Sequence, residues 1–202
     1  MPNATDVGAR AKDWLPTLME IGAAPTINIG SYNDDLDYVI GNTACWVSAS
    51  TINNPTNYYG LCETWDSGIG GVVQRISTSK GCVQRIKTSN GWGEWEWINP
   101  PLTPGEEHRT TERYLGKPVY VKVIDFGAWP TANSYVQVDF NTSGKTLIDI
   151  QTTGYAEANG YSTINYPTTT VQAYAGIIKL INNNSFTLAG IRGCFVVKYV
   201  YN

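Results

Sequence analysis

The chain has 202 residues, with 14 Lys and Arg against 17 Asp and Glu, which gives a formal charge of −3. Because phosphate binding needs a dense basic footprint, this balance argues against nucleic acid as the main partner. No window approaches the roughly 18 apolar residues of a membrane span, and the N-terminal segment lacks the basic and then apolar order of a signal peptide, so we expect neither membrane insertion nor secretion by that route.

The composition favours an all-β fold. Only 15% of the residues are charged, whereas the chain holds 13 Tyr, 7 Trp and 20 Gly. Aromatic and β-branched residues suit the half-buried surface of a sheet. The length is sufficient for two small domains, and we expect two.

Residues 1–30 predict a short shaft or linker. The segments "DVGA" at 6–9 and "EIGA" at 20–23 form an approximate repeat of an acidic residue, an aliphatic residue and Gly-Ala. A repeat this short cannot bury its own apolar side chains, so it implies neighbouring chains or a longer stack. The alternatives are a mobile linker or a short helix between Asp13 and Gly22, which Pro16 would interrupt.

Residues 31–100 predict a small antiparallel β domain, in which the tetrapeptide VQRI occurs at 73–76 and again at 83–86. A three-residue turn at 79–81 would place Gly81 where the backbone is left-handed. That register predicts two faces. One carries Val72, Gln74, Ile76, Cys82, Gln84 and Ile86, and the other carries Val73, Arg75, Ser77, Val83, Arg85 and Lys87.

In that register Arg75 and Arg85 face each other, so something must offset the repulsion of like charges. The dipeptide Asn90-Gly91 predicts a second two-residue hairpin turn. The resulting pairs are Arg85 with Glu96, Lys87 with Glu94, Ile86 with Trp95, and Gln84 with Trp97. We expect the glutamate carboxylates to neutralise the arginine charges; the alternative is that the arginines hold an acidic group of a ligand. We expect Trp92, Trp95 and Trp97 to pack this domain.

Residues 101–109 predict a linker, because Pro101, Pro104 and Gly105 interrupt strand formation. The chain's single histidine, His108, lies there and is expected in water. A His-dependent nucleophile or a His-rich metal site is therefore not expected.

Residues 110–202 predict an antiparallel, jelly-roll-like β-sandwich, since strand-forming runs of about 5 to 9 residues are separated by turn residues. The runs are "KPVYVKVIDFG", "SYVQVDF", "TLIDIQ", "TVQAYAGIIKLI", "SFTLAG" and "RGCFVVKYVY".

Four segments of the chain resemble parts of known proteins. The segment "GGVVQRISTSKGCVQRIKTSNGWGEWEWIN", together with "SYNDDLDYVIGNTACWVSASTINNP", resembles the knob modules of phage and pyocin-like fibres. The segment "TTERYLGKPVYVKVIDFGAWP" resembles the entry strand of their head domains, and "GIRGCFVVKYVYN" resembles the last strand of such heads. The 1–30 repeat is similar to the Val-Gly-Ala repeats of fibre shafts.

The resemblance implies a homotrimer with a knob at 31–100 and a receptor-binding head at 110–202, at the tip of a fibre that is assembled in the cytoplasm of the bacterial host. The implied partners are the rest of the fibre and a bacterial surface glycan or other receptor. Because the chain starts inside the repeat, we expect it to be part of a longer fibre.

Sugars bind to aromatic rings and to amide or hydroxyl groups on exposed loops. The expected ligand-binding residues are Trp129, Asn133, Tyr135, Tyr155, Asn159, Tyr161 and Tyr166 of the second domain, with Tyr58 and Tyr59 of the first.

No catalytic residue, metal or cofactor is expected. Asp34, Asp35 and Asp37 are too close in sequence to flank a substrate, and they lack the spacing of an EF-hand, so a calcium site is the less favoured alternative to a turn. The four cysteines show no CxxC spacing, and we expect buried free thiols. The rival functions are a small polysaccharide-degrading tail enzyme and a purely structural trimerisation tip.

Overall fold

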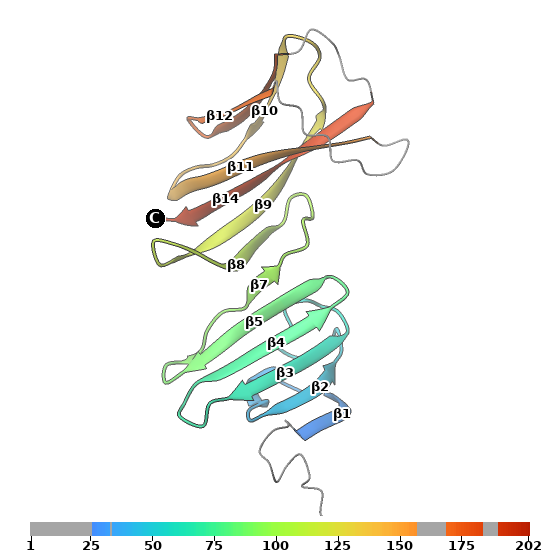
Figure 1. Cartoon of the computed structure of the whole chain (residues 1–202), viewed down its shortest axis with the longest axis vertical. Coiled ribbons are helices and arrows are strands. Elements are labelled where there is room, and N and C mark those ends of the chain that lie inside the picture. Colours follow the sequence, from blue (N-terminus) through green and yellow to red (C-terminus); the bar gives the residue numbers. More distant parts are fainter. Residues whose placement is uncertain (1–25, 33, 157–168, 184–189) are drawn as a thin grey trace, which may run out of the picture. The chain divides into compact units, whose positions relative to one another are not determined.

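The computed structural model describes residues 26–32, 34–156, 169–183 and 190–202, with only the backbone described for 26–32, 155 and 156 (Figure 1). Within this part of the chain the fold is all-β, apart from one short 3-10 turn, and the sequence prediction of the fold class is confirmed. The chain divides into two compact units, Met1–Ser79 with Arg85–Glu94, and Lys80–Gln84 with Trp95–Asn202.

The first unit is built on one sheet with the order β1-β2-β3-β4 followed by the second half of β5. Its elements are β1 (Thr26–Tyr32), the 3-10 turn η1 (Leu36–Tyr38), β2 (Thr43–Val47), β3 (Gly60–Asp66), β4 (Val72–Thr78), β5 (Gly81–Thr88) and β6 (Gly91–Trp92). β1 pairs with β2 in parallel, whereas β2, β3 and β4 pair antiparallel.

The predicted register of the VQRI hairpin is wrong by one residue. β4 ends at Thr78 and β5 begins at Gly81, so two residues connect the strands instead of three. Since side chains alternate between the faces of a strand, one residue fewer turns the second strand over. As a result Gln74 of the first copy and Arg85 of the second lie on the same, buried face, and Arg85 Nε donates to Gln74 Oε1 at 2.9 Å.

Arg85 is only 5% exposed, and its charge is balanced by Asp37, with 2.6 Å between Nη1 and Oδ1. Its guanidinium lies 4.1 Å from the ring centre of Trp92, whose indole N–H donates to the Asp37 carbonyl at 3.1 Å. Burial lowers the pKa of Arg85, while the hydrogen bond and charge of Asp37 oppose that shift. Asp35 caps the 3-10 turn by accepting from the Asp37 N–H, so these aspartates build the turn that receives Arg85.

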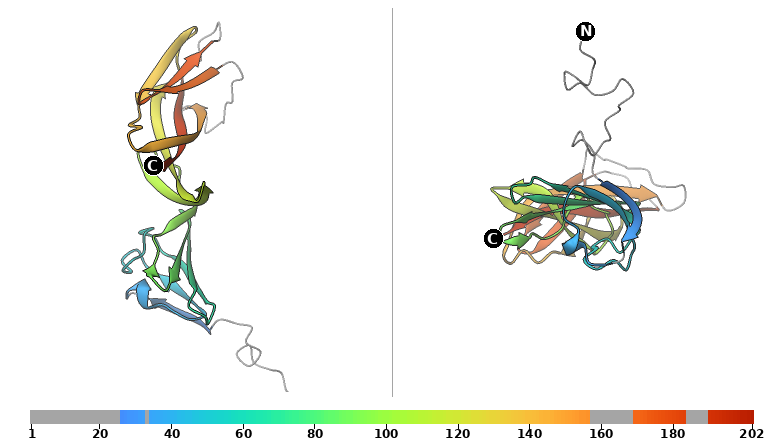
Figure 2. Two further views of the ribbon diagram at one scale, coloured as in Figure 1. Left: turned by 90° about the vertical axis from the view of Figure 1, so that its left-hand side faces the viewer. Right: turned by 90° about the horizontal axis from the view of Figure 1, so that it is seen from below.

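The second unit is a β-sandwich, as predicted (Figure 2). The larger sheet has the order β5 (first half)-β7-β8-β9-β14-β11, with β7 (Glu96–Asn99), β8 (Glu107–Tyr114), β9 (Lys117–Ala128), β14 (Ile191–Tyr201) and β11 (Lys145–Ala156). The smaller sheet has the order β10 (Ser134–Asp139)-β13 (Ile177–Asn182)-β12 (Thr169–Tyr174). Between them the core holds Phe126, Trp129, Phe140, Ile178, Leu180, Phe195, Val197 and Tyr199.

The predicted linker at 101–109 belongs in part to this sandwich. β8 starts at Glu107, and His108 is 9% exposed, with its ring edge-on to Trp97 at 5.3 Å between centroids. The prediction of a histidine in water is therefore wrong. Three tryptophans were expected to pack the first domain. Trp95 and Trp97 belong to the second unit instead, and Trp92 belongs to the first.

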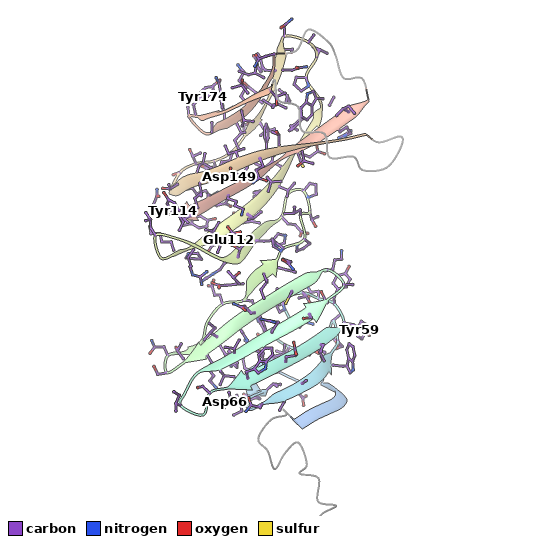
Figure 3. All side chains as sticks on the ribbon, viewed as in Figure 1. Tyr59, Asp66, Glu112, Tyr114, Asp149 and Tyr174 are labelled. Atoms are coloured by element: carbon purple, nitrogen blue, oxygen red, sulfur yellow. The ribbon has the colours of Figure 1, made fainter. Side chains whose placement is uncertain are left out.

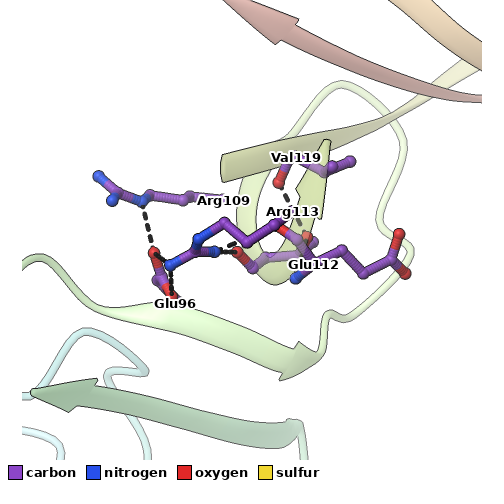
Figure 4. Close-up of polar contacts among 6 residues, drawn as sticks. Glu96, Arg109, Glu112, Arg113 and Val119 are labelled. Carbon is purple, nitrogen blue, oxygen red and sulfur yellow. Dashed lines mark hydrogen bonds and ion pairs between the residues drawn. The ribbon is translucent and has the colours of Figure 1, made fainter. Parts of the chain in front are cut away.

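Glu96 joins neighbouring strands of the second unit and does not pair with Arg85 (Figure 4). Its carboxylate accepts from Arg109 Nε at 3.0 Å and from Arg113 Nη2 at 2.7 and 2.8 Å. The predicted Arg85–Glu96 pair is thus replaced by a pair with arginines of β8. Because Trp97 and Thr110 are the residues that pair β7 with β8, these ionic contacts help to fix a short parallel ladder.

Candidate functional site

The smaller sheet of the sandwich turns one face to the core and the other to solvent. Val136 and Val138 of β10 and Ile178 and Leu180 of β13 point inward, and the two β13 side chains are fully buried. Because side chains alternate along a strand, the residues between them point outward. We call this surface the outer face. It consists of Tyr135, Gln137 and Asp139 on β10, Ile177, Lys179 and Ile181 on β13, and Thr170, Gln172 and Tyr174 on β12.

Strand register arranges the outer face in three rows. Tyr135, Ile181 and Thr170 form the first row, Gln137, Lys179 and Gln172 the middle row, and Asp139, Ile177 and Tyr174 the third. Strand spacing and residue rise give this array a span of about 10 Å by about 13 Å between Cα atoms. The two tyrosines occupy opposite corners, with exposed fractions of 55% and 51%; Figure 3 labels Tyr174 on its strand.

Lys179, at the centre of the array, extends over Tyr135. Its ammonium nitrogen lies 3.7 Å from the ring centre, a close cation–π contact. This contact restrains both side chains, so part of the ordering that a ligand would otherwise impose is already present. More than half of the Tyr135 side chain still faces solvent.

Buried polar contacts hold the strands that carry the face. Asn182, at the end of β13, is fully buried, and its amide donates to the carbonyls of Pro130 at 2.9 Å and Thr131 at 3.3 Å. These bonds fix the loop that leads into β10 and therefore the start of the strand bearing Tyr135. At the opposite end, the Phe140 N–H donates to the Gly176 carbonyl at 2.6 Å.

The structure separates the predicted binding residues. Tyr135 lies on the outer face, and Asn133 is exposed in the turn just before β10, with φ of +51°. Tyr58 and Tyr59 are also exposed but belong to the first unit. Tyr155 lies in β11, where only its backbone is described; Asn159, Tyr161 and Tyr166 lie outside the described residues.

Trp129 is a core residue, which corrects the expectation of a ring open to ligand. It is 4% exposed and packs edge-on against Phe126, with 5.7 Å between ring centroids. A Cβ added at Gly154 would stand 2.9 Å from its ring, so the indole fills the space above that glycine. Trp129 therefore supports the fold of the sandwich.

Sequence reasoning missed Tyr174, Lys179 and the two glutamines of the middle row. The available signal was the alternation in "SYVQVDF" and "TVQAYAGIIKLI": every second residue is apolar, and Ala175-Gly176 marks a hairpin turn. Recognising that these two segments share one sheet required the pairing of β10 with β13, which is distant in sequence.

Among the described residues, no group of three or more His, Cys, Asp or Glu side chains is placed to hold a metal ion. In the same part of the chain, no helix is long and apolar enough to cross a membrane. None of the four cysteines forms a disulfide within the described part of the chain, and Cys45 and Cys62, which are cross-strand partners on β2 and β3, are buried.

Comparison with known proteins identifies solved structures of pyocin tail fibres as similar. An N-truncated R2-type pyocin tail fibre matches 83% of this chain and 96% of its own, at 9% identity and a TM-score of 0.31. A C-terminal fragment of the Pseudomonas aeruginosa R1 pyocin fibre matches 94% of this chain and 72% of its own, at 12% identity and a TM-score of 0.35. No protein-family model and no curated protein matches the chain.

Proposed function

We propose that this chain is the receptor-binding part of a phage- or pyocin-type tail fibre, and that it attaches to a bacterial surface glycan through the outer face without catalysis. At TM-scores of 0.31 and 0.35 the structural similarities carry no weight in this proposal. The observation that carries it is the pair of half-exposed tyrosines at opposite corners of the strand array, with two carboxamides between them.

Such an array has the chemistry that sugars require. The C–H face of a pyranose packs on an aromatic ring, while its hydroxyl groups need partners that both donate and accept hydrogen bonds. Gln137 and Gln172 supply both kinds of group, and Thr170 adds a hydroxyl. The span of the face favours an extended oligosaccharide over a single buried sugar.

The same face is poorly equipped for hydrolysis. Glycosidases use two carboxyl groups on either side of the scissile bond. Asp139 contributes the one carboxylate among the nine residues of the outer face. Binding without cleavage is therefore the function that these residues support.

We also propose that the chain acts as a homotrimer within a longer fibre. Large apolar side chains stand exposed on the single first unit, among them Trp46, Trp65 and Ile69, and partner chains would cover such residues. Three identical faces would raise avidity by orders of magnitude over one weak site, which relaxes the affinity that each face needs.

The test compares adsorption of the labelled chain and its variants to a panel of bacterial strains. Tyr135→Ala and Tyr174→Ala should each weaken binding about tenfold, which corresponds to about 1.4 kcal/mol. Tyr114→Ala is the matched control, since Tyr114 is an exposed tyrosine of the same unit on β8, away from the outer face (Figure 3).

Equal binding by all three variants would overturn the assignment of the outer face, and would favour a structural tip if adsorption also survives changes elsewhere on the head. Release of reducing ends from the bound polysaccharide would instead support the enzymatic alternative. Thermal unfolding of each variant checks that the fold is retained.

A further inference from the structure

The middle row of the outer face places one positive charge between two carboxamides. Gln137, Lys179 and Gln172 are register partners across β10, β13 and β12. Strand spacing puts neighbouring members about 4.8 Å apart at their Cα atoms. Each carboxamide carries two N–H donors and the ammonium carries three, so the row is rich in hydrogen-bond donors.

The ammonium of Lys179 is held in place but is not neutralised by an ion pair with any residue that the structure describes. The ammonium nitrogen contacts the ring of Tyr135, 3.7 Å from the ring centre. An aromatic ring attracts a cation through its quadrupole and leaves the net charge in place. The charge therefore remains available to an anion that approaches from solvent.

The opposing charge on the face lies to one side. Asp139 belongs to the third row, on the strand next to Lys179, and its Cα partner is Ile177. Its carboxylate would repel an anion on the middle row, but at a greater distance than the ammonium would attract it. No other charged residue belongs to the outer face.

We infer that the glycan bound by the outer face is anionic, and that its acid group, a carboxylate or a phosphate, lies on the middle row against Lys179. The two tyrosines then pack against sugar rings on either side of that group. This inference rests on the proposed function and adds the ligand's chemical class, with Lys179 as the residue that determines specificity.

The experiment uses surface polysaccharide extracted from the strain that the intact chain binds most tightly. One portion is left untreated, a second is carboxyl-reduced with carbodiimide and borohydride, and a third is dephosphorylated with hydrofluoric acid. One of the two treatments should weaken binding at least tenfold and thereby identify the source of the charge. Equal binding to all three portions would overturn the inference.

Two variants test the same point from the protein side. Lys179→Gln should weaken binding to the untreated extract about tenfold and remove most of its dependence on salt, whereas Lys179→Arg should retain both. Asp139→Asn is the matched control on the same face, and it should strengthen binding because it removes a repelling charge.

The outcomes separate the two proposals. In one outcome, the intact chain binds the untreated extract and the tyrosine variants weaken this binding, but the lysine variants do not. The outer face is then the binding site, and an acid group is not part of its ligand. If the intact chain binds no strain and no extract, the proposed function fails, and the anionic ligand fails with it.

Discussion

Tyr199 is fully buried in the second unit although it carries a polar hydroxyl group. That hydroxyl donates to the carboxylate of Glu107, which also accepts from the Tyr201 hydroxyl at 3.0 Å. Burial, with the hydrogen bond and negative charge of Glu107, raises the pKa of Tyr199 far above its ordinary value of 10.0. The folded state therefore holds this proton more tightly than the unfolded chain.

Because the pKa is raised on folding, the stability linked to Tyr199 is fully present below about pH 10 and is lost progressively as the pH rises above it. We therefore expect the melting temperature to fall as the pH is raised above about 10. Tyr199→Phe should lower it by the equivalent of about 1 kcal/mol at neutral pH and make the alkaline fall shallower. Thermal unfolding followed by circular dichroism measures both effects; parallel curves for the two proteins would contradict the assignment.

At the scale of elements, two hairpins turn on similar pairs of left-handed residues. Leu115-Gly116 joins β8 to β9, with φ of +50° and +79°, and Ala175-Gly176 joins β12 to β13, with +47° and +83°. Two successive positive φ values match the type I′ turn, whose twist fits the right-handed twist of the two antiparallel strands that it connects. Gly suits the second position because it has no Cβ. Leu and Ala at the first position are strained, because a left-handed backbone brings their Cβ too close to the following carbonyl oxygen.

We expect Leu115→Asn to stabilise the protein by about 1 kcal/mol, because Asn adopts this conformation readily and the Leu115 side chain is 86% exposed. A gain of that size corresponds to a rise of about 2 to 4 °C in melting temperature. Gly116→Ala is the opposing control and should lower it. A Leu115→Asn variant that melts below the parent would show that the exposed leucine has a packing role.

The VQRI hairpin shows where sequence reasoning stops. The all-β class and the described strands of the sandwich follow from composition, alternation and turn residues. Loop length does not, because "TSKG" fits a two-residue or a three-residue turn, and one residue decides which face is buried. Gln74 and Arg85 are polar, so the hydrophobic pattern of the sequence did not predict that their side chains would be buried.

The candidate site was predictable only in part, for a related reason. Tyr135 was identified from its loop-like surroundings, whereas Trp129, four residues before the β10 turn residue Asn133, has the same local signals and is buried. Whether an aromatic ring near a turn packs inward depends on the sheet opposite. That sheet is formed by strands distant in the chain, which local patterns do not specify.

At the scale of the whole molecule, a homotrimer has a definite mass in solution. Light scattering of the purified chain should give three times the 22.2 kDa of one chain, independent of dilution through the micromolar range. A stable monomer would contradict the trimer and remove the avidity argument. It would leave the chemistry of the outer face intact, since all nine residues of that face come from one chain.

The alternation of Tyr135, Val136, Gln137, Val138 and Asp139 also has an evolutionary consequence. The odd-numbered positions are exposed and the even-numbered ones pack in the sandwich. If the outer face binds the ligand as we propose, recognition can change while the core is inherited unaltered. Chains descended from this one and adapted to other host surfaces should therefore diverge along β10 with a period of two. Host range could shift through a few exposed substitutions, at little cost in stability.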